Sequence, residues 1–197
     1  MFSAKKHKFK KIFSFLIYPL KKLNITPNQI TFGSFLLSFL VFYFVLKYEF
    51  LIALILLVFT SLFDALDGFL ARDIKRETKW GAYLDTITDR YVEFIILFSF
   101  FFVDIPKVVF SAEVWIALCI FGSLMTTYSK SAFSEKTNKK LESGFIERPE
   151  RMVLLMIGVY LASINLIYLS YFLILFALLT NLSALQRIIK SLKKIKN

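Results

Sequence analysis

The amino-acid sequence predicts an all-α integral membrane protein, with six transmembrane helices preceded by an N-terminal amphipathic helix in the membrane interface. Of its 197 residues, 57% are hydrophobic, which is too apolar for an ordinary soluble domain. The apolar residues gather in runs suited to spanning a bilayer. No polar stretch between these runs is long enough for a second domain, so residues 1–197 are expected to form a single membrane domain.

The expected juxtamembrane helix covers residues 5–22. Its apolar side chains share one helical face, whereas Lys8 and Lys11 lie elsewhere, as in helices that rest in the membrane interface. A disordered basic tail is the alternative interpretation. The apolar face consists of Phe9, Ile12, Phe13, Leu16 and Ile17.

The first span is expected to begin at Thr26-Pro27, because Thr is a good N-cap and Pro is favoured at the first helical position. The last two spans are joined tightly around Asn165. In chain order, the predicted spans are residues 27–46, 50–70, 81–103, 108–127, 151–164 and 166–185.

Basic residues are distributed as in a membrane protein whose two termini face the cytoplasm. The chain carries 25 Lys and Arg and has a net charge of +11. These residues gather at both termini and in alternate loops, and only Lys47 and Lys107 fall in the other set of loops. Topology and contact with anionic lipid headgroups account for this excess, so nucleic-acid binding is not expected.

Residues 64–89 place four aspartates at the ends of two apolar segments. On a helix, Asp64 and Asp67 share one face, and so do Asp85 and Asp89 on the segment that follows. The polar loop 73–79 is short enough to bring the two faces together. The first face also carries Gly68, Ala71 and Arg72, and the second Gly81 and Thr88.

Four converging carboxylates would repel one another unless cations lay between them. Ligands that are all oxygen, with no His or Cys, favour hard ions, so Mg²⁺ or Mn²⁺ is expected. Gly68 and Ala71 leave room for a ligand to approach the backbone, and Arg72 supplies a planar fork suited to phosphate oxygens. A structural carboxylate cluster or a proton pathway is the alternative interpretation of these intramembrane acids.

A second group of charged residues lies later in the chain. Lys130 follows apolar residues closely, so it either snorkels to the membrane surface or turns into a site. Arg148 and Arg151 stand three residues apart at the start of the fifth predicted span and would share a face beside the helix amides. They form either a phosphate site or ordinary cytoplasmic flanking charges.

The spacing D-x2-D-G-x2-A-R-x8-G-x3-D-x3-D resembles that of the CDP-alcohol phosphotransferase family. It is filled without a mismatch by Asp64, Asp67, Gly68, Ala71, Arg72, Gly81, Asp85 and Asp89. The resemblance implies a membrane enzyme that transfers a phosphatidyl-type group from a CDP-linked lipid to the hydroxyl of a small polar acceptor, with release of CMP. It also implies two Mg²⁺ ions, for which Mn²⁺ substitutes, and a homodimer.

By the same resemblance, the residues of the motif acquire roles. Asp64, Asp67 and Asp85 ligate metal, and Asp89 completes the cluster and acts as the general base. Gly68, Ala71 and Arg72 contact CDP, and Thr78 caps the loop or touches the nucleotide. The segment ITPNQIT resembles the stretch that lies near the nucleotide in the family, with Thr26, Asn28 and Thr31 as candidates, although simple helix capping explains it equally well.

The acceptor is expected to be a phosphorylated alcohol, held between the Asp cluster and the basic residues Lys130, Arg148 and Arg151. A dianionic phosphate gains from two guanidinium groups and the helix amides, whereas a neutral acceptor does not need them. Tyr128-x-Lys130 and the segment ERPER (residues 147–151) resemble the inositol-phosphate branch of the family, although Ala132 and Ser134 replace its usual Arg and Glu. Glycerol 3-phosphate and serine are the alternative acceptors.

Two other classes of function are weighed against the transferase. A cation or proton transporter would carry its acids or broken helices near mid-membrane, whereas these four aspartates lie at one face, and inverted repeats are not apparent. A membrane scaffold would not need four aspartates. The transferase is therefore the predicted function.

Overall fold

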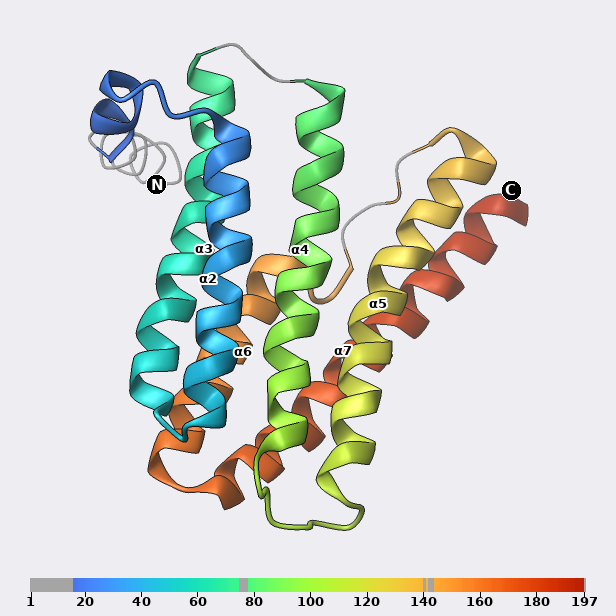
Figure 1. Cartoon of the computed structure of the whole chain (residues 1–197). Helices are drawn as coiled ribbons and strands as arrows, with labels where there is room; N and C mark the ends of the chain where they lie inside the picture. The colour runs from blue at the N-terminus through green and yellow to red at the C-terminus, as the bar shows by residue number, and fades with distance from the viewer. Residues whose placement is uncertain (1–15, 75–77, 140, 142–143, 197) are drawn as a thin grey trace, which may run out of the picture. The chain divides into compact units, whose positions relative to one another are not determined.

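The structure is a computed structural model that describes residues 16–74, 78–139, 141 and 144–196. Within these ranges the chain is helical and forms no β-strand, and Figure 1 traces it from helix to helix. Residues 16–22 are also helical. The named elements are α2 (Pro27–Leu46), α3 (Phe50–Asp73), α4 (Lys79–Ser99), the 3₁₀ helix η1 (Phe100–Phe102), α5 (Ala112–Thr137), α6 (Arg148–Ile164) and α7 (Leu166–Lys196).

The N-termini of two helices are closed by reciprocal side-chain caps. α2 begins at Pro27 as predicted, and Thr26 and Gln29 cap each other's backbone N–H groups at 2.8 and 3.4 Å. Glu147 and Glu150 form the same capping box at the start of α6. Both helices therefore begin where the local sequence places a cap and a proline.

Four helices of the described residues are long and apolar enough to cross a membrane. They comprise α2, α3, α5 and residues Leu166–Ile195 of α7. α4 carries several charged residues, and α6 has only 17 residues. The protein is an integral membrane protein, and the count of six spans stays a prediction.

α5 differs in extent from the span predicted at 108–127. It begins at Ala112 and continues to Thr137, where Asn138 ends it in the left-handed conformation with φ of 53°. The apolar residues before it are not helical: Val109 has a positive φ of 63°, and the Val108 carbonyl accepts a hydrogen bond of 3.0 Å from the Trp115 indole N–H. The prediction relied on apolar composition alone, and it therefore placed the start of this helix too early in the chain.

Packing divides the chain into two compact units. The first comprises Met1–Leu40 and Ile55–Val92, and the second Val41–Leu54 and Glu93–Asn197. The motif of residues 64–89 belongs entirely to the first unit, whereas Lys130, Arg148 and Arg151 belong to the second.

In the first unit, helical residues 16–22 pack against α2 and α3. Ile17 is buried in one apolar cluster with Ile30, Leu66 and Leu70, and Lys21 forms an ion pair with Asp73 at the end of α3. This part of the predicted juxtamembrane helix is thus present as a helix. Residues 5–15, which carry the rest of its amphipathic pattern, lie outside the described residues.

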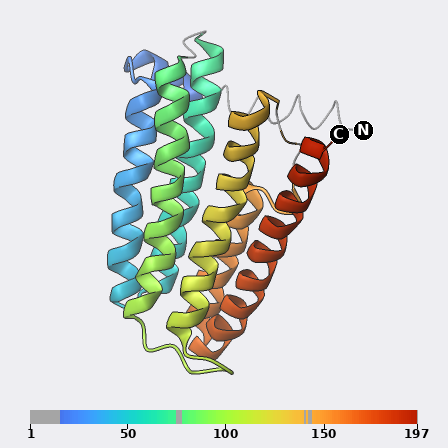
Figure 2. The same ribbon diagram turned by 90° about the vertical axis from the view of Figure 1, so that its right-hand side faces the viewer.

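In the second unit, α5 and α7 lie side by side along much of their length (Figure 2). Gly122 of α5 makes the close approach possible, because a Cβ there would lie 2.4 Å from Thr180 Oγ1 and 2.9 Å from the backbone nitrogen of Asn181. Nearby, the Asn181 side chain donates a 2.9 Å hydrogen bond to the Leu118 carbonyl. A glycine is therefore needed at this helix crossing.

Replacing Gly122 by Ala should destabilise the protein by about 1–3 kcal/mol, because the added methyl group meets backbone as well as side-chain atoms. Thermal unfolding in detergent measures this effect. Gly33→Ala is the matched control, since a Cβ there would make only ordinary contact with Phe63 at 3.6 Å. Equal stability of the two variants would contradict the close packing of α5 on α7.

Candidate metal and substrate site

Three of the four motif aspartates converge in the first unit. Asp64 of α3 and Asp85 and Asp89 of α4 each place a carboxylate oxygen within 4.8 Å of the others, and all three side chains are half-buried. The α4 pair is brought together by its four-residue spacing, and the packing of α3 on α4 adds the third carboxylate. The donor set is all oxygen and fits a hard divalent cation such as Mg²⁺ or Mn²⁺.

Asp67 has a different environment from the other three aspartates. It is only 4% exposed, and its carboxylate lies 2.5 Å from Thr31 Oγ1 of α2. The same hydroxyl lies 3.1 Å from the Pro27 carbonyl. A hydroxyl has one proton to donate, and the contact with Asp67 is the shorter of the two, so Thr31 orients the Asp67 side chain.

A cavity of about 280 Å³ in the first unit brings the motif residues together. Its wall includes every residue predicted to contact CDP, together with Asp67 and Asp85. Asp64 and Asp89 are not among the lining residues. The start of α2 contributes a third wall. The lining residues are Pro27, Asn28, Thr31, Asp67, Gly68, Ala71, Arg72, Thr78, Gly81, Ala82 and Asp85.

Arg72 is held in this cavity by its neighbours on α3. Its guanidinium lies over the Phe69 ring, 5.2 Å from the centroid, in a cation–π contact. A Cβ at Gly68 would lie 3.7 Å from Arg72 Nη1. The absence of a side chain at Gly68 therefore leaves the face of the guanidinium open to the cavity.

The rim of the cavity depends on close contact between the start of α2 and the start of α4. Thr78 Oγ1 accepts a 3.0 Å hydrogen bond from the Gly81 N–H, so Thr78 both caps α4 and lines the cavity. A Cβ at Gly81 would lie 3.2 Å from Asn28 Oδ1. Of the ITPNQIT candidates, Asn28 and Thr31 line the cavity, whereas Thr26 serves as the cap of α2.

The three predicted acceptor residues occupy different environments in the second unit. Lys130 is exposed on α5, and Arg148 is half-buried at the first position of α6. Arg151 is only 2% exposed, and its Nε and Nη2 donate hydrogen bonds of 2.6 and 2.9 Å to the two carboxylate oxygens of Glu93. Its role in acceptor binding stays a prediction.

Sequence reasoning did not identify Arg187 of α7 as more than the start of a basic tail. Its side chain is buried, and it donates to the Thr126 carbonyl at 2.9 Å and to the Ile146 carbonyl at 3.1 Å. Arg187 Nη2 also lies 2.8 Å from Glu147. Its position directly after an apolar run was the available signal, because a basic residue there needs a partner when the helix is packed.

Glu147 stays ionised in this arrangement. Burial raises its pKa, but the Gly144 N–H, the Arg187 guanidinium and the charge of Lys130 together hold the pKa below its usual range. Glu147 at the start of α6 and Arg187 of α7 therefore form a charged pair in the second unit.

A sequence model of the CDP-alcohol phosphatidyltransferase family matches residues 24–183, which include parts of both units. The chain is 36% identical to a bifunctional IPC transferase and DIPP synthase of Aquifex aeolicus, covering 87% of this chain and 40% of that protein. It is 33% identical to an archaetidylinositol phosphate synthase of Pyrococcus horikoshii, covering 90% of this chain and 89% of that protein.

The fold is that of a solved relative. The crystal structure of the phosphatidylinositol phosphate synthase of Mycobacterium tuberculosis with CDP-DAG bound superposes with a TM-score of 0.78 at 22% identity, over 92% of this chain and 94% of that one. The motif of residues 64–89, the cavity that it lines and the match over residues 24–183 agree: the chain belongs to the CDP-alcohol phosphatidyltransferase family.

Proposed function

We propose that this protein transfers a phosphatidyl-type group from a CDP-linked lipid to a hydroxyl group of an inositol phosphate, with release of CMP. The observation that carries the proposal is that Asp67, Asp85 and Arg72 line the same cavity, beside Gly68. The carboxylates can bind cations there, and the guanidinium can bind phosphate. The names of relatives, among them an archaetidylinositol phosphate synthase that is 33% identical, support the acceptor class.

The residues of the first unit have distinct proposed roles. Asp64, Asp85 and Asp89 hold the cations, with Asp67 as the fourth carboxylate oriented by Thr31. Two bound Mg²⁺ or Mn²⁺ ions would supply charge neutralisation to the diphosphate and the departing CMP. Arg72 binds diphosphate oxygens, Gly68 and Ala71 leave space for the nucleotide, and Thr78 fixes the rim.

The reaction is a substitution at the phosphorus that carries the lipid. The acceptor oxygen forms a bond to this phosphorus, the bond to the oxygen of CMP breaks, and the acceptor proton passes to Asp89 as general base. An ordinary carboxylate is a weak base for an alcohol, so the charged surroundings of Asp89 must assist the transfer. In the second unit, Lys130, Arg148 and Arg151 belong to the proposed acceptor-phosphate site.

The same proposal includes the membrane arrangement. Six spans, a juxtamembrane helix over residues 5–22, and a cytoplasmic position for both termini and the aspartates agree with the alternation of basic loops. The family match across residues 24–183 supports one functional domain over both units. A homodimer is proposed from the resemblance to the family.

An acceptor panel tests the function. Purified enzyme with CDP-lipid and Mg²⁺ should release CMP and incorporate labelled inositol 1-phosphate into a lipid phosphate, whereas inositol, serine and glycerol 3-phosphate should react poorly. A sample with excess EDTA is the control. Incorporation of serine or glycerol 3-phosphate would overturn the acceptor but keep the reaction class, and a lack of CMP release with every acceptor would overturn the class.

A further inference from the structure

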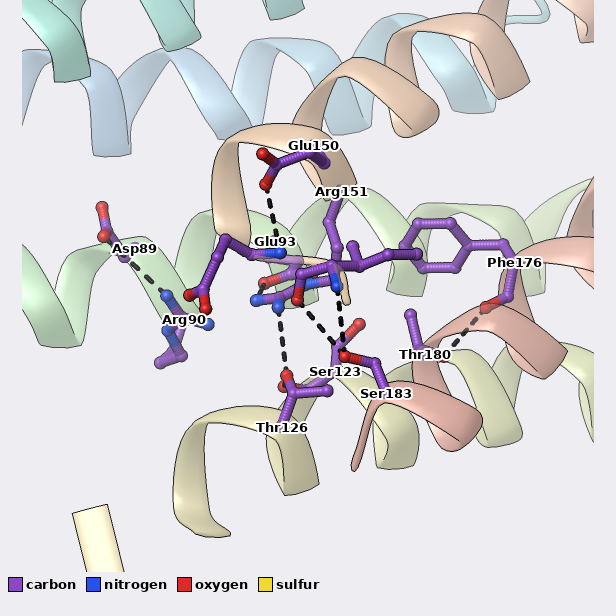
Figure 3. Close-up of polar contacts among 12 residues, drawn as sticks. Asp89, Arg90, Glu93, Ser123, Thr126, Glu150, Arg151, Phe176, Thr180 and Ser183 are labelled. Atoms are coloured by element: carbon purple, nitrogen blue, oxygen red, sulfur yellow. Dashed lines mark hydrogen bonds and ion pairs between the residues drawn. The ribbon is translucent and has the colours of Figure 1, made fainter. Parts of the chain in front are cut away.

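Arg151 is held through three of its N–H groups by two residues of the second unit, Glu93 and Thr126. Its Nε and Nη2 engage both carboxylate oxygens of Glu93, at 2.6 and 2.9 Å. Its Nη1 donates a 3.0 Å hydrogen bond to Thr126 Oγ1 on α5, as Figure 3 shows. Glu93 is 3% exposed and Arg151 2%, so this is a bidentate ion pair removed from solvent.

Thr126 joins this pair to a second buried arginine. Its hydroxyl accepts from Arg151, while its carbonyl accepts a 2.9 Å hydrogen bond from Arg187 Nη1 on α7. Arg187 is in turn paired with Glu147 at 2.8 Å. Two acids and two arginines therefore balance in charge, and residues of α4, α5, α6 and α7 are tied together through Thr126.

The helix register connects the Arg151 pair to the other proposed acceptor residues. Lys130 follows Thr126 by one turn of α5, and Arg148 precedes Arg151 by three residues in the first turn of α6. The contacts of Arg151 therefore fix the two helix segments from which Lys130 and Arg148 project. A rotation of either segment would have to break a buried, charge-assisted hydrogen bond.

We infer that Arg151 is a positioning residue, clasped by Glu93 and Thr126, which holds Lys130 and Arg148 in place for the acceptor phosphate instead of binding the phosphate itself. The inference rests on the proposed function and refines it. Three of the five N–H donors of the Arg151 guanidinium are already used within the protein. Glu93 neutralises its charge, so little attraction remains for a further anion.

A double-mutant cycle separates positioning from direct binding. Glu93→Gln and Arg151→Gln each leave one buried charge without its partner, so each should lower Tm by roughly 10 °C. Each should also raise the KM for inositol 1-phosphate by roughly tenfold, with little change in the KM for CDP-lipid. The double variant carries two neutral amides that can hydrogen-bond, so both Tm and the acceptor KM should return close to the wild-type values.

A double variant that regains Tm while its acceptor KM stays raised would overturn the inference, because Arg151 would then bind the phosphate directly. A double variant that regains neither would overturn it as well, because the two residues would not act as a pair. Should a single variant fail to fold, Glu93→Asp keeps the charge and shortens the side chain by one methylene. It should still raise the KM for the acceptor alone, and an equal rise in both KM values would count against positioning.

Ser170→Ala is the control for general loss of stability. Ser170 is buried in the same unit and donates a 2.7 Å hydrogen bond to the Pro106 carbonyl, but it has no contact with the Arg151 pair. Its loss should lower Tm and leave the acceptor KM unchanged. If the wild-type enzyme uses an acceptor other than inositol 1-phosphate, the proposed function is wrong about the acceptor. The Tm values of the single and double variants still show whether Glu93 and Arg151 act as a pair.

Discussion

Replacing Asp64, Asp85 or Asp89 by Asn should lower CDP-lipid-dependent CMP release by roughly 100-fold or more, because cation-assisted charge stabilisation contributes several kcal/mol to such reactions. The three carboxylates lie within 4.8 Å of one another, so the loss of any one leaves an incomplete set of ligands. Asp67→Asn should have a comparable effect, since Asp67 lines the cavity with Asp85. Excess EDTA should abolish turnover by the wild-type enzyme.

Cation binding can be measured separately from activity. Addition of Mg²⁺ or Mn²⁺ should raise the Tm of the wild-type protein, because a ligand that binds only the folded state stabilises it. The Asn variants should lose this response. Asp73→Asn is a matched control on the same helix, because Asp73 is paired with Lys21 and does not line the cavity. A folded, active Asp85→Asn or Asp89→Asn enzyme would contradict the assignment of the cluster.

Arg72→Lys should raise the KM for CDP-lipid by roughly tenfold, because lysine keeps the charge but loses the planar fork that binds two phosphate oxygens. The cavity geometry supports this expectation, since the Arg72 guanidinium is held over the Phe69 ring and faces the open position at Gly68. The KM for the acceptor should not change. Initial rates at varied CDP-lipid and fixed acceptor measure the effect.

Lys79→Gln is the control for Arg72. Lys79 is an exposed cation at the start of α4 in the same unit, and it does not line the cavity. Its loss should leave the KM for CDP-lipid within the error of the measurement. If Arg72→Lys and Lys79→Gln behaved alike, the guanidinium would have no specific part in donor binding.

Much of the cavity in the first unit could be predicted from the sequence, because its residues are related by helical spacing. Asp85 and Asp89 share a face of α4, and Gly68 and Arg72 share a face of α3, whatever the rest of the fold does. The short loop between the helices brings the faces together. The distinct environment of Asp67 was not predictable, because it depends on Thr31, which is 36 residues away in the sequence.

The sequence by itself determined the helical membrane class, the cap at Thr26 and the shared helical faces of Asp64 with Asp67 and of Asp85 with Asp89, since these depend on composition and on neighbours within a few turns. Only the tertiary structure decided that Arg151 pairs with Glu93 across 58 residues and that Arg187 is buried. From the sequence, Arg151 was predicted to bind the acceptor phosphate, with ordinary flanking charge as the alternative, and Arg187 was taken as the start of a basic tail. Their partners are chosen by helix packing, because a buried charge must find an opposite charge or a hydrogen-bond acceptor wherever the fold places one.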